Sequence, residues 1–151
     1  MDSLDKLVVR LVDWLLYNQW DIEKAIHATD YQVSSKWEKD YVVYRSQIDS
    51  FVERFVASQD YHLNIVLTVR SAIFLLDSDY FDIYSMRYVD YKTMDEMANM
   101  ISVSSRTIKR KVMDIREHTW RELQEEGIFL ESIVDLRKKY WYIPRKEKTK
   151  K

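Results

Sequence analysis

Cysteine is absent from this chain of 151 residues, and glycine and proline occur once each, as Gly127 and Pro144. Without cysteine the protein forms neither disulfides nor a thiolate nucleophile, which fits a reducing compartment. Because β-rich folds use glycine and proline in tight turns, their scarcity favours helices joined by Ser and Asx turns. No apolar run approaches the ~20 residues of a membrane span, and the N-terminus lacks the apolar core of a signal peptide. We therefore expect an all-α protein that is soluble and cytoplasmic.

Charge is distributed unevenly along the chain, although the formal net charge is only −1. Residues 1–60 have a net charge of −4 and residues 61–103 of −3, whereas residues 104–151 carry 14 Lys or Arg against 8 Asp or Glu. A basic third attached to an acidic body predicts a local surface for a polyanion. A solvated helix followed by a basic tail, Arg145 to Lys151, would explain the same charges without a partner.

The first half of the chain shows the apolar spacing of helices. This spacing predicts an amphipathic helix from about Ser3 to Tyr17, a short helix around Asp21–Ala28 and a loop over Thr29–Ser34. Ser35 and Glu38 have the spacing of a capping box and so predict the start of the next helix.

That next helix is expected to end at Ser58-Gln59-Asp60. Its aromatic and aliphatic residues step by 4, 3, 4, 3 and 4 positions, which forms an a/d seam for an intramolecular bundle or a dimer: Trp37, Tyr41, Tyr44, Ile48, Phe51 and Phe55. A helix from Leu63 to Leu76 is apolar on nearly all sides and predicts the centre of a bundle. After a turn at Asp77-Ser78-Asp79, an aromatic-rich helix extends from Tyr80 to Val89.

The stretch from Tyr91 to Arg121 has the layout of a helix-turn-helix. Thr93 and Glu96 form a capping box for its first helix, and Ser104 is placed to cap the second. Ala98 provides the small side chain that lets two helices pack closely. The second helix is expected to stop at Gly127, before a last helix from Ile128 to Lys139. The residues expected to form the shared core are Met94, Met97, Ile101, Val103, Ile108, Val112 and Ile115.

The start of the second helix is rich in cations, since residues 105–111 carry four and no anion. The N-terminal turns of such a helix meet base edges in the major groove, and Arg can bind guanine through two hydrogen bonds. Side chains expected at or next to bases are Ser104, Ser105, Arg106, Lys109 and Arg110. Side chains expected to meet phosphates, which fix register and make binding depend on salt, are Lys92, Thr93, Thr107, Lys111 and Arg116.

The rest of the chain offers little chemistry. His27, His62 and His118 have no acidic or histidine neighbour at metal-ligand spacing, and we expect surface or boundary positions for them. Asp77, Asp79 and Asp82 lack the Gly and downstream Glu of a calcium loop and are interpreted as helix caps. We therefore expect no enzymatic activity, no metal and no cofactor.

Residues from about Tyr41 to Glu126, with the segments SAIFLLDSDY and DIYSMRYVDYKTMDEMANMISVSSRTIKRKVMDI, carry a family resemblance. The chain resembles the ArpU/RinA-like family of phage and prophage transcriptional regulators, and more broadly is similar to the helix-turn-helix of sigma-factor region 4. The features that carry the resemblance are the Leu75-Leu76-Asp77 turn, the Arg87-Tyr88 pair and the Ser104-Ser105-Arg106-Thr107 helix start. The resemblance implies binding of promoter-proximal DNA and activation of late phage operons in a bacterial host. It also implies that Ser105, Arg106, Lys109 and Arg110 occupy the DNA-reading positions.

The sequence thus predicts a multi-helix bundle that binds double-stranded DNA as a transcriptional regulator. Residues 1–76 would form a helical body and oligomer surface, 77–126 the DNA-binding region, and 127–151 a terminal helix and basic tail. Because one helix-turn-helix reads few base pairs, a homodimer is expected, and RNA polymerase is a further candidate partner. The alternatives are a small terminase-like DNA-packaging protein, a compact sigma-like factor and an adaptor or inhibitor whose basic head binds an acidic protein.

Overall fold

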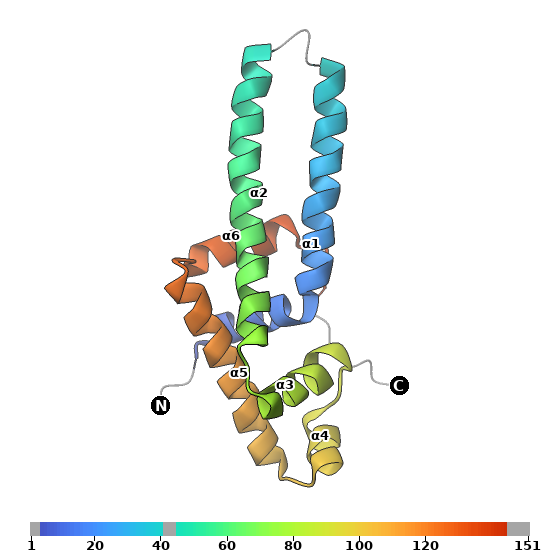
Figure 1. Cartoon of the computed structure of the whole chain (residues 1–151), viewed down its shortest axis with the longest axis vertical. Coiled ribbons are helices and arrows are strands. Elements are labelled where there is room, and N and C mark those ends of the chain that lie inside the picture. The colour runs from blue at the N-terminus through green and yellow to red at the C-terminus, as the bar shows by residue number, and fades with distance from the viewer. Residues whose placement is uncertain (1–3, 41–44, 145–151) are drawn as a thin grey trace.

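In the computed structural model the chain is all-α, as the sequence predicts, and the described residues contain no strand. The structure describes residues 4–40 and 45–144, with side chains described outside 29–59. The elements in chain order are α1 (Lys6–Asp40), α2 (Arg45–Phe74), α3 (Ser78–Tyr84), the π-helical η1 (Ser85–Val89), α4 (Met94–Ile101), α5 (Ser105–Glu125) and α6 (Leu130–Lys139). Figure 1 shows α1 and α2 as a long hairpin, with the shorter helices gathered at the end away from its tip.

The hairpin differs from the sequence prediction because both of its helices are continuous. Four expectations are wrong, since α1 and α2 run through these segments: the separation of the helices Ser3–Tyr17 and Asp21–Ala28, the loop over Thr29–Ser34, the helix start at Ser35 and the helix end at Ser58-Gln59-Asp60. Ser, Thr and Asp disfavour a helix interior by less than about 1 kcal/mol each, which is too little to stop a helix that a packed neighbour supports. The expected seam from Trp37 to Phe55 lies outside the residues whose side chains are described.

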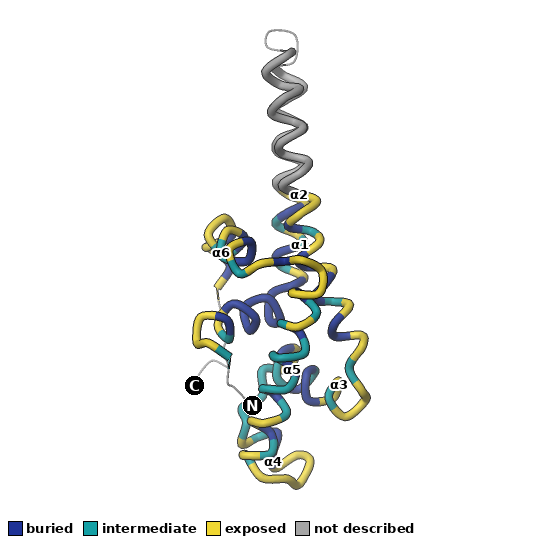
Figure 2. Tube along the Cα trace, turned by 90° about the vertical axis from the view of Figure 1, so that its left-hand side faces the viewer, coloured by how far each residue is buried: buried dark blue, intermediate teal, exposed yellow. Residues whose placement is uncertain are grey.

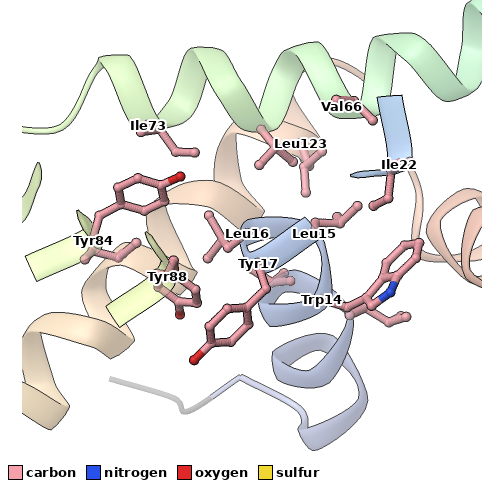
Figure 3. Close-up of a cluster of buried hydrophobic side chains, with 14 of the residues drawn as sticks. Trp14, Leu15, Leu16, Tyr17, Ile22, Val66, Ile73, Tyr84, Tyr88 and Leu123 are labelled. Carbon is pink, nitrogen blue, oxygen red and sulfur yellow. The ribbon is translucent and has the colours of Figure 1, made fainter. Parts of the chain in front are cut away.

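The core forms around the first turns of α1, which lie across the molecule before the helix turns along the long axis (Figure 1). Trp14, Leu15 and Leu16 of α1 are almost fully buried. Figure 3 shows Leu15 and Leu16 facing Leu123 of α5 and the side of α2 that carries Val66 and Ile73, so three helices distant in the sequence share one core. Burial of each such side chain contributes roughly 1.5–3 kcal/mol, so the N-terminal helix is an essential part of the fold.

The chain after α6 is attached to the same part of α1. Trp14 Nε1 donates to the Ile143 carbonyl at 3.0 Å, and Asn18 Nδ2 donates to the Pro144 carbonyl at 3.0 Å. Arg137 of α6 lies over the Trp14 ring at 4.9 Å and also donates to the Ile143 carbonyl at 3.2 Å. The N-terminal helix and the segment before the basic tail therefore stabilise each other.

His62 of α2 is buried in this structure, so the surface or boundary position expected for it is wrong. Its side chain is 6% exposed, and its Nδ1 has no hydrogen-bond partner among the described residues. Burial lowers the pKa of His62 from its usual 6.5, and the nearby charge of Lys139 lowers it further against the opposing effect of Asp135. The folded protein therefore favours the neutral imidazole.

This burial predicts a loss of stability in mild acid. A histidine whose folded pKa is depressed stabilises the protein fully above the unfolded pKa of about 6.5, and this contribution is lost as the pH falls toward the folded pKa. We expect the free energy of unfolding from urea titrations to fall across this window, and to fall less steeply in His62→Gln. Identical pH slopes for the two proteins would contradict a neutral buried His62.

Candidate nucleic-acid interface

The capping box expected at the start of α4 is present. Thr93 Oγ1 accepts from the Glu96 N–H at 3.1 Å, and Glu96 Oε1 accepts from the Thr93 N–H at 3.4 Å. These bonds satisfy two N–H groups that a helix start otherwise leaves without partners. Thr93 therefore has a structural role in addition to the phosphate contact predicted for it.

The turn between α4 and α5 is tight and depends on a left-handed residue. Ser102 has φ 58° and ψ 46°, and its N–H donates to the Ala98 carbonyl. The Val103 N–H donates to the same carbonyl at 3.1 Å. Ala98 is buried, as the close packing of the two helices requires. Residues 94–125 thus form a helix-turn-helix with an eight-residue first helix.

The conformation of Ser102 predicts a stabilising substitution. A left-handed conformation costs a residue with a Cβ about 1–2 kcal/mol, whereas glycine adopts it without strain. Part of that gain is offset by the greater freedom of glycine in the unfolded chain, about 0.5–1 kcal/mol. We expect Ser102→Gly to raise the free energy of unfolding by up to about 1 kcal/mol, measured by urea titration. Ser102→Val should lower it, and the opposite order would show that this turn is not held left-handed.

The first turn of α5 uses its hydroxyl groups within the protein. Ser104 Oγ accepts from the Thr107 N–H at 3.1 Å, which confirms the predicted N-cap, and lies 2.9 Å from Thr107 Oγ1. Ser105 Oγ donates to Asp95 Oδ1 of α4. The Ser105 bond therefore links α5 to α4, whereas Ser104 and Thr107 cap α5 itself, and Ser104 remains exposed beside the cations.

The cations at the start of α5 point to solvent. Arg106, Lys109 and Arg110 are exposed, and none of them pairs with a carboxylate among the described residues. Their spacing of three and four positions puts them on neighbouring parts of one helix surface. Figure 2 shows exposed residues around α4 at this end of the molecule, as well as along α3 and α6. The structure therefore leaves three positive side chains available to an anionic partner.

The other two predicted lysines have more restricted surroundings. Lys111 is half-buried, and its Nζ lies 4.7 Å from the centre of the Tyr80 ring. Lys92 is half-buried just before α4, and its carbonyl accepts from Arg87 Nη1 at 3.3 Å. Lys92 precedes α4 and Lys111 directly follows Arg110, so both lie near the exposed cations but are less accessible.

Arg116 corrects the sequence prediction, because it faces the interior and not a phosphate. Its side chain is 13% exposed, and its Nε and Nη2 donate to the two oxygens of Asp13, each at 2.8 Å. Tyr88 of η1 also donates to Asp13, at 2.6 Å. Asp13 itself is fully buried. Arg116 is therefore part of an internal cluster and not of the candidate interface.

The electrostatics of this cluster follow from its burial. Burial raises the pKa of Tyr88 well above its usual 10, and the neighbouring carboxylate of Asp13 raises it further, so the phenol stays protonated and donates. Burial opposes the charge of Arg116, but the hydrogen bonds and charge of Asp13 outweigh this effect and raise the pKa of Arg116. One feature of the sequence indicates the cluster: Asp13 lies in an otherwise apolar run from Val12 to Leu16.

Two residues expected in the shared core are exposed instead. Ile101 at the end of α4 is 41% exposed and Val103 in the turn is 38% exposed, next to Met100 at 60%. Ile101 is the last residue of α4 and Val103 follows the left-handed Ser102, so both flank the turn, beyond the buried Met97 and Ala98. The helix-turn-helix therefore presents apolar side chains beside its cations.

No group of three or more metal-ligating side chains occurs in the part of the chain that the structure describes. His118 Nε2 lies 2.9 Å from the Ala72 carbonyl oxygen. His27 Nε2 lies 3.9 Å from Oε1 of Glu23, four positions earlier, so the expectation that His27 has no acidic neighbour is wrong. Asp77 stands at the N-cap of α3 without a side-chain hydrogen bond to the helix. Among residues 4–40 and 45–144, no helix is long and apolar enough to cross a membrane.

In comparisons with known proteins, no family model, no curated protein and no solved structure matches the chain.

Proposed function

We propose that this protein is a sequence-specific DNA-binding transcriptional regulator that reads DNA with the start of α5. The observation that carries the proposal is the set of three exposed, unpaired cations, Arg106, Lys109 and Arg110, at the N-terminal turns of the second helix of a helix-turn-helix. This is the part of the motif that enters a major groove. The positive end of the helix dipole adds to their attraction for phosphate.

The rest of the molecule supports a localised interface. Residues 1–60 and 61–103 are net negative, so the body repels DNA while the basic head attracts it. The helix-turn-helix lies at the opposite end from the tip of the α1–α2 hairpin (Figure 1), so a bound duplex leaves the hairpin uncovered. We further propose a homodimer, because two copies of the helix-turn-helix are needed to read a site of ordinary length.

The resemblance to phage and prophage regulators supports a more particular role. On that basis we propose an activator of late prophage genes that acts in the bacterial cytoplasm and contacts RNA polymerase. The exposed Met100, Ile101 and Val103 beside the reading helix provide an apolar surface for such a contact. DNA binding does not depend on this finer proposal and is tested separately.

Selection of bound genomic fragments, followed by footprinting, tests the proposed function. We expect one or a few strongly protected sites upstream of an operon, each with two half-sites about one helical turn or a multiple of it apart. Uniform weak retention of all fragments would contradict sequence-specific reading.

A protein partner is the second candidate function. The exposed Met100, Ile101 and Val103 favour it, because apolar side chains next to cations also suit an acidic protein surface. Competition at rising salt separates the two candidates, since counterion release weakens duplex binding steeply and predictably. Complete displacement of an acidic protein partner by random duplex DNA would favour DNA as the natural ligand.

A further inference from the structure

A buried polar cluster connects the reading helix to the N-terminal helix. Asp13 of α1 accepts two hydrogen bonds from Arg116 of α5, each at 2.8 Å, and one from Tyr88 of η1 at 2.6 Å. Arg116 and Tyr88 are 103 and 75 positions away from Asp13 in the chain, so the cluster joins α1, η1 and α5 at one point. Tyr88 is further packed against Tyr17 at 4.6 Å and Tyr84 at 5.7 Å between ring centres.

The geometry of this cluster restrains rotation of α5. A guanidinium that binds both oxygens of one carboxylate has a fixed plane, and a rotation of the helix about its axis would break at least one of the two bonds. Arg116 lies ten residues after Arg106 on the same continuous helix, roughly 15 Å along its axis. A helix of this length behaves as a rigid rod, so the rotation fixed at Arg116 is transmitted to the exposed cations.

Stability alone does not account for such a cluster. Well-packed apolar residues of similar size often stabilise a fold as well as a buried ion pair, and the best-attested use of buried ionic groups is to select one arrangement among several. Here the arrangement that they select is the orientation of the candidate DNA-reading surface. Asp13 and Tyr88 come from outside the helix-turn-helix, so the body takes part in setting that orientation.

We propose that Asp13, Tyr88 and Arg116 are positioning residues that fix the orientation of the reading helix and thereby its discrimination between DNA sequences. The proposal rests on the proposed function for its effect on DNA, but the orientation itself can be measured without DNA. None of the three residues is proposed to touch DNA, because the guanidinium of Arg116 is bound to Asp13 and not available to a phosphate.

The test replaces the whole cluster by apolar residues of similar size, with Asp13→Leu, Tyr88→Phe and Arg116→Met combined in the full chain. The carboxylate, the phenol hydroxyl and the guanidinium of the cluster are then removed together. Glu23→Gln is the matched control, because Glu23 pairs at 2.8 Å with Arg70 of α2, an ion pair that does not touch α5. Since the chain has no cysteine, spin labels at Lys24→Cys and Asn99→Cys, both at exposed positions, report the distance between body and head.

We expect the triple variant to stay helical and to give a shifted or broader distance distribution. Its preference for a footprinted site over a scrambled duplex should fall by about tenfold to a hundredfold, the loss of one well-made base contact. Its affinity for the scrambled duplex and the salt slope should not change, because the exposed cations remain. Glu23→Gln should match the original protein in all these measurements.

An unchanged distance distribution together with an unchanged preference would overturn the positioning role. If the original protein does not distinguish the two duplexes, the proposed function fails, while the distance measurement still decides whether the cluster orients the head. If the triple variant does not fold, Arg116→Lys provides the same comparison, because it keeps the charge but loses the two-pronged geometry. A distance distribution for Arg116→Lys equal to that of the original protein would again overturn the proposal.

Discussion

Replacing Asp13 with alanine should lower the free energy of unfolding by about 3–5 kcal/mol, the cost of breaking a buried ion pair by removing one partner. The substitution leaves the guanidinium of Arg116 in a site where it is 13% exposed, without its carboxylate. It also leaves the buried hydroxyl of Tyr88 without the acceptor that it now has at 2.6 Å. Since small domains unfold with only about 5–15 kcal/mol, this loss should be visible as a large fall in the urea midpoint.

Asp82→Ala is the matched control for this measurement, since Asp82 is exposed on α3. Its effect should be within about 0.5 kcal/mol, as for most surface substitutions. If Asp13→Ala were as mild as Asp82→Ala, the cluster around Asp13 would not exist in solution as the structure shows it.

The combined substitution of Arg106 and Arg110 by alanine should remove most of the affinity for a footprinted site. Two bidentate base contacts of roughly 1–3 kcal/mol each correspond to a loss of about 30-fold to 10⁴-fold in the dissociation constant. Both side chains are exposed and make no ion pair among the described residues, so stability and helix content should not change. Titration of labelled duplex by fluorescence anisotropy gives the affinity, and circular dichroism checks the fold.

Arg121→Ala is the control here, because Arg121 is an exposed cation on the same helix, 15 positions after Arg106 and so far from the N-terminal turns. Arg121→Ala removes one positive charge where the double substitution removes two, and it leaves Arg106 and Arg110 unchanged. Undiminished binding by Arg106→Ala/Arg110→Ala, or an equal loss in Arg121→Ala, would contradict the assignment of the reading surface.

The sequence predicted the helix-turn-helix well, because its signals are local. Thr93 with Glu96, and Ser104 with Thr107, interact across three positions, so their spacing alone indicates the hydrogen bonds that the structure contains. Gly127 has φ 74°, as a glycine just after a helix is expected to have. Such short-range chemistry can be interpreted without knowledge of the fold.

The hairpin was predicted less well, because its continuity depends on packing between distant residues. Thr29–Ser34 and Ser58-Gln59-Asp60 contain residues that favour turns in isolation, yet α1 and α2 continue through both. In the same way, Ile101 and Val103 fit a helical core pattern, but they flank the turn at Ser102 and are exposed. The spacing of apolar residues shows which face of one helix can be buried, but it does not show where the neighbouring helices lie.

The role of Arg116 could not be derived from its own segment. On a helix rich in cations a further arginine is naturally assigned to phosphate, and its partner Asp13 is 103 positions away. Asp13 was the better indicator, since a carboxylate between buried Val12 and Trp14 needs a partner. The partner of a carboxylate in an apolar run can lie anywhere in the chain, because packing and not sequence distance brings the two together.

Sequence-specific DNA binding is tested by the affinities of the full chain for a footprinted duplex and a scrambled duplex, measured across a range of salt concentrations. We expect the footprinted site to bind at least about 10³-fold more tightly at moderate salt. We also expect the logarithm of each affinity to fall linearly with the logarithm of salt concentration, by about 0.9 for each phosphate contact. Equal affinities for the two duplexes, or binding that does not respond to salt, would contradict sequence-specific DNA binding by the start of α5.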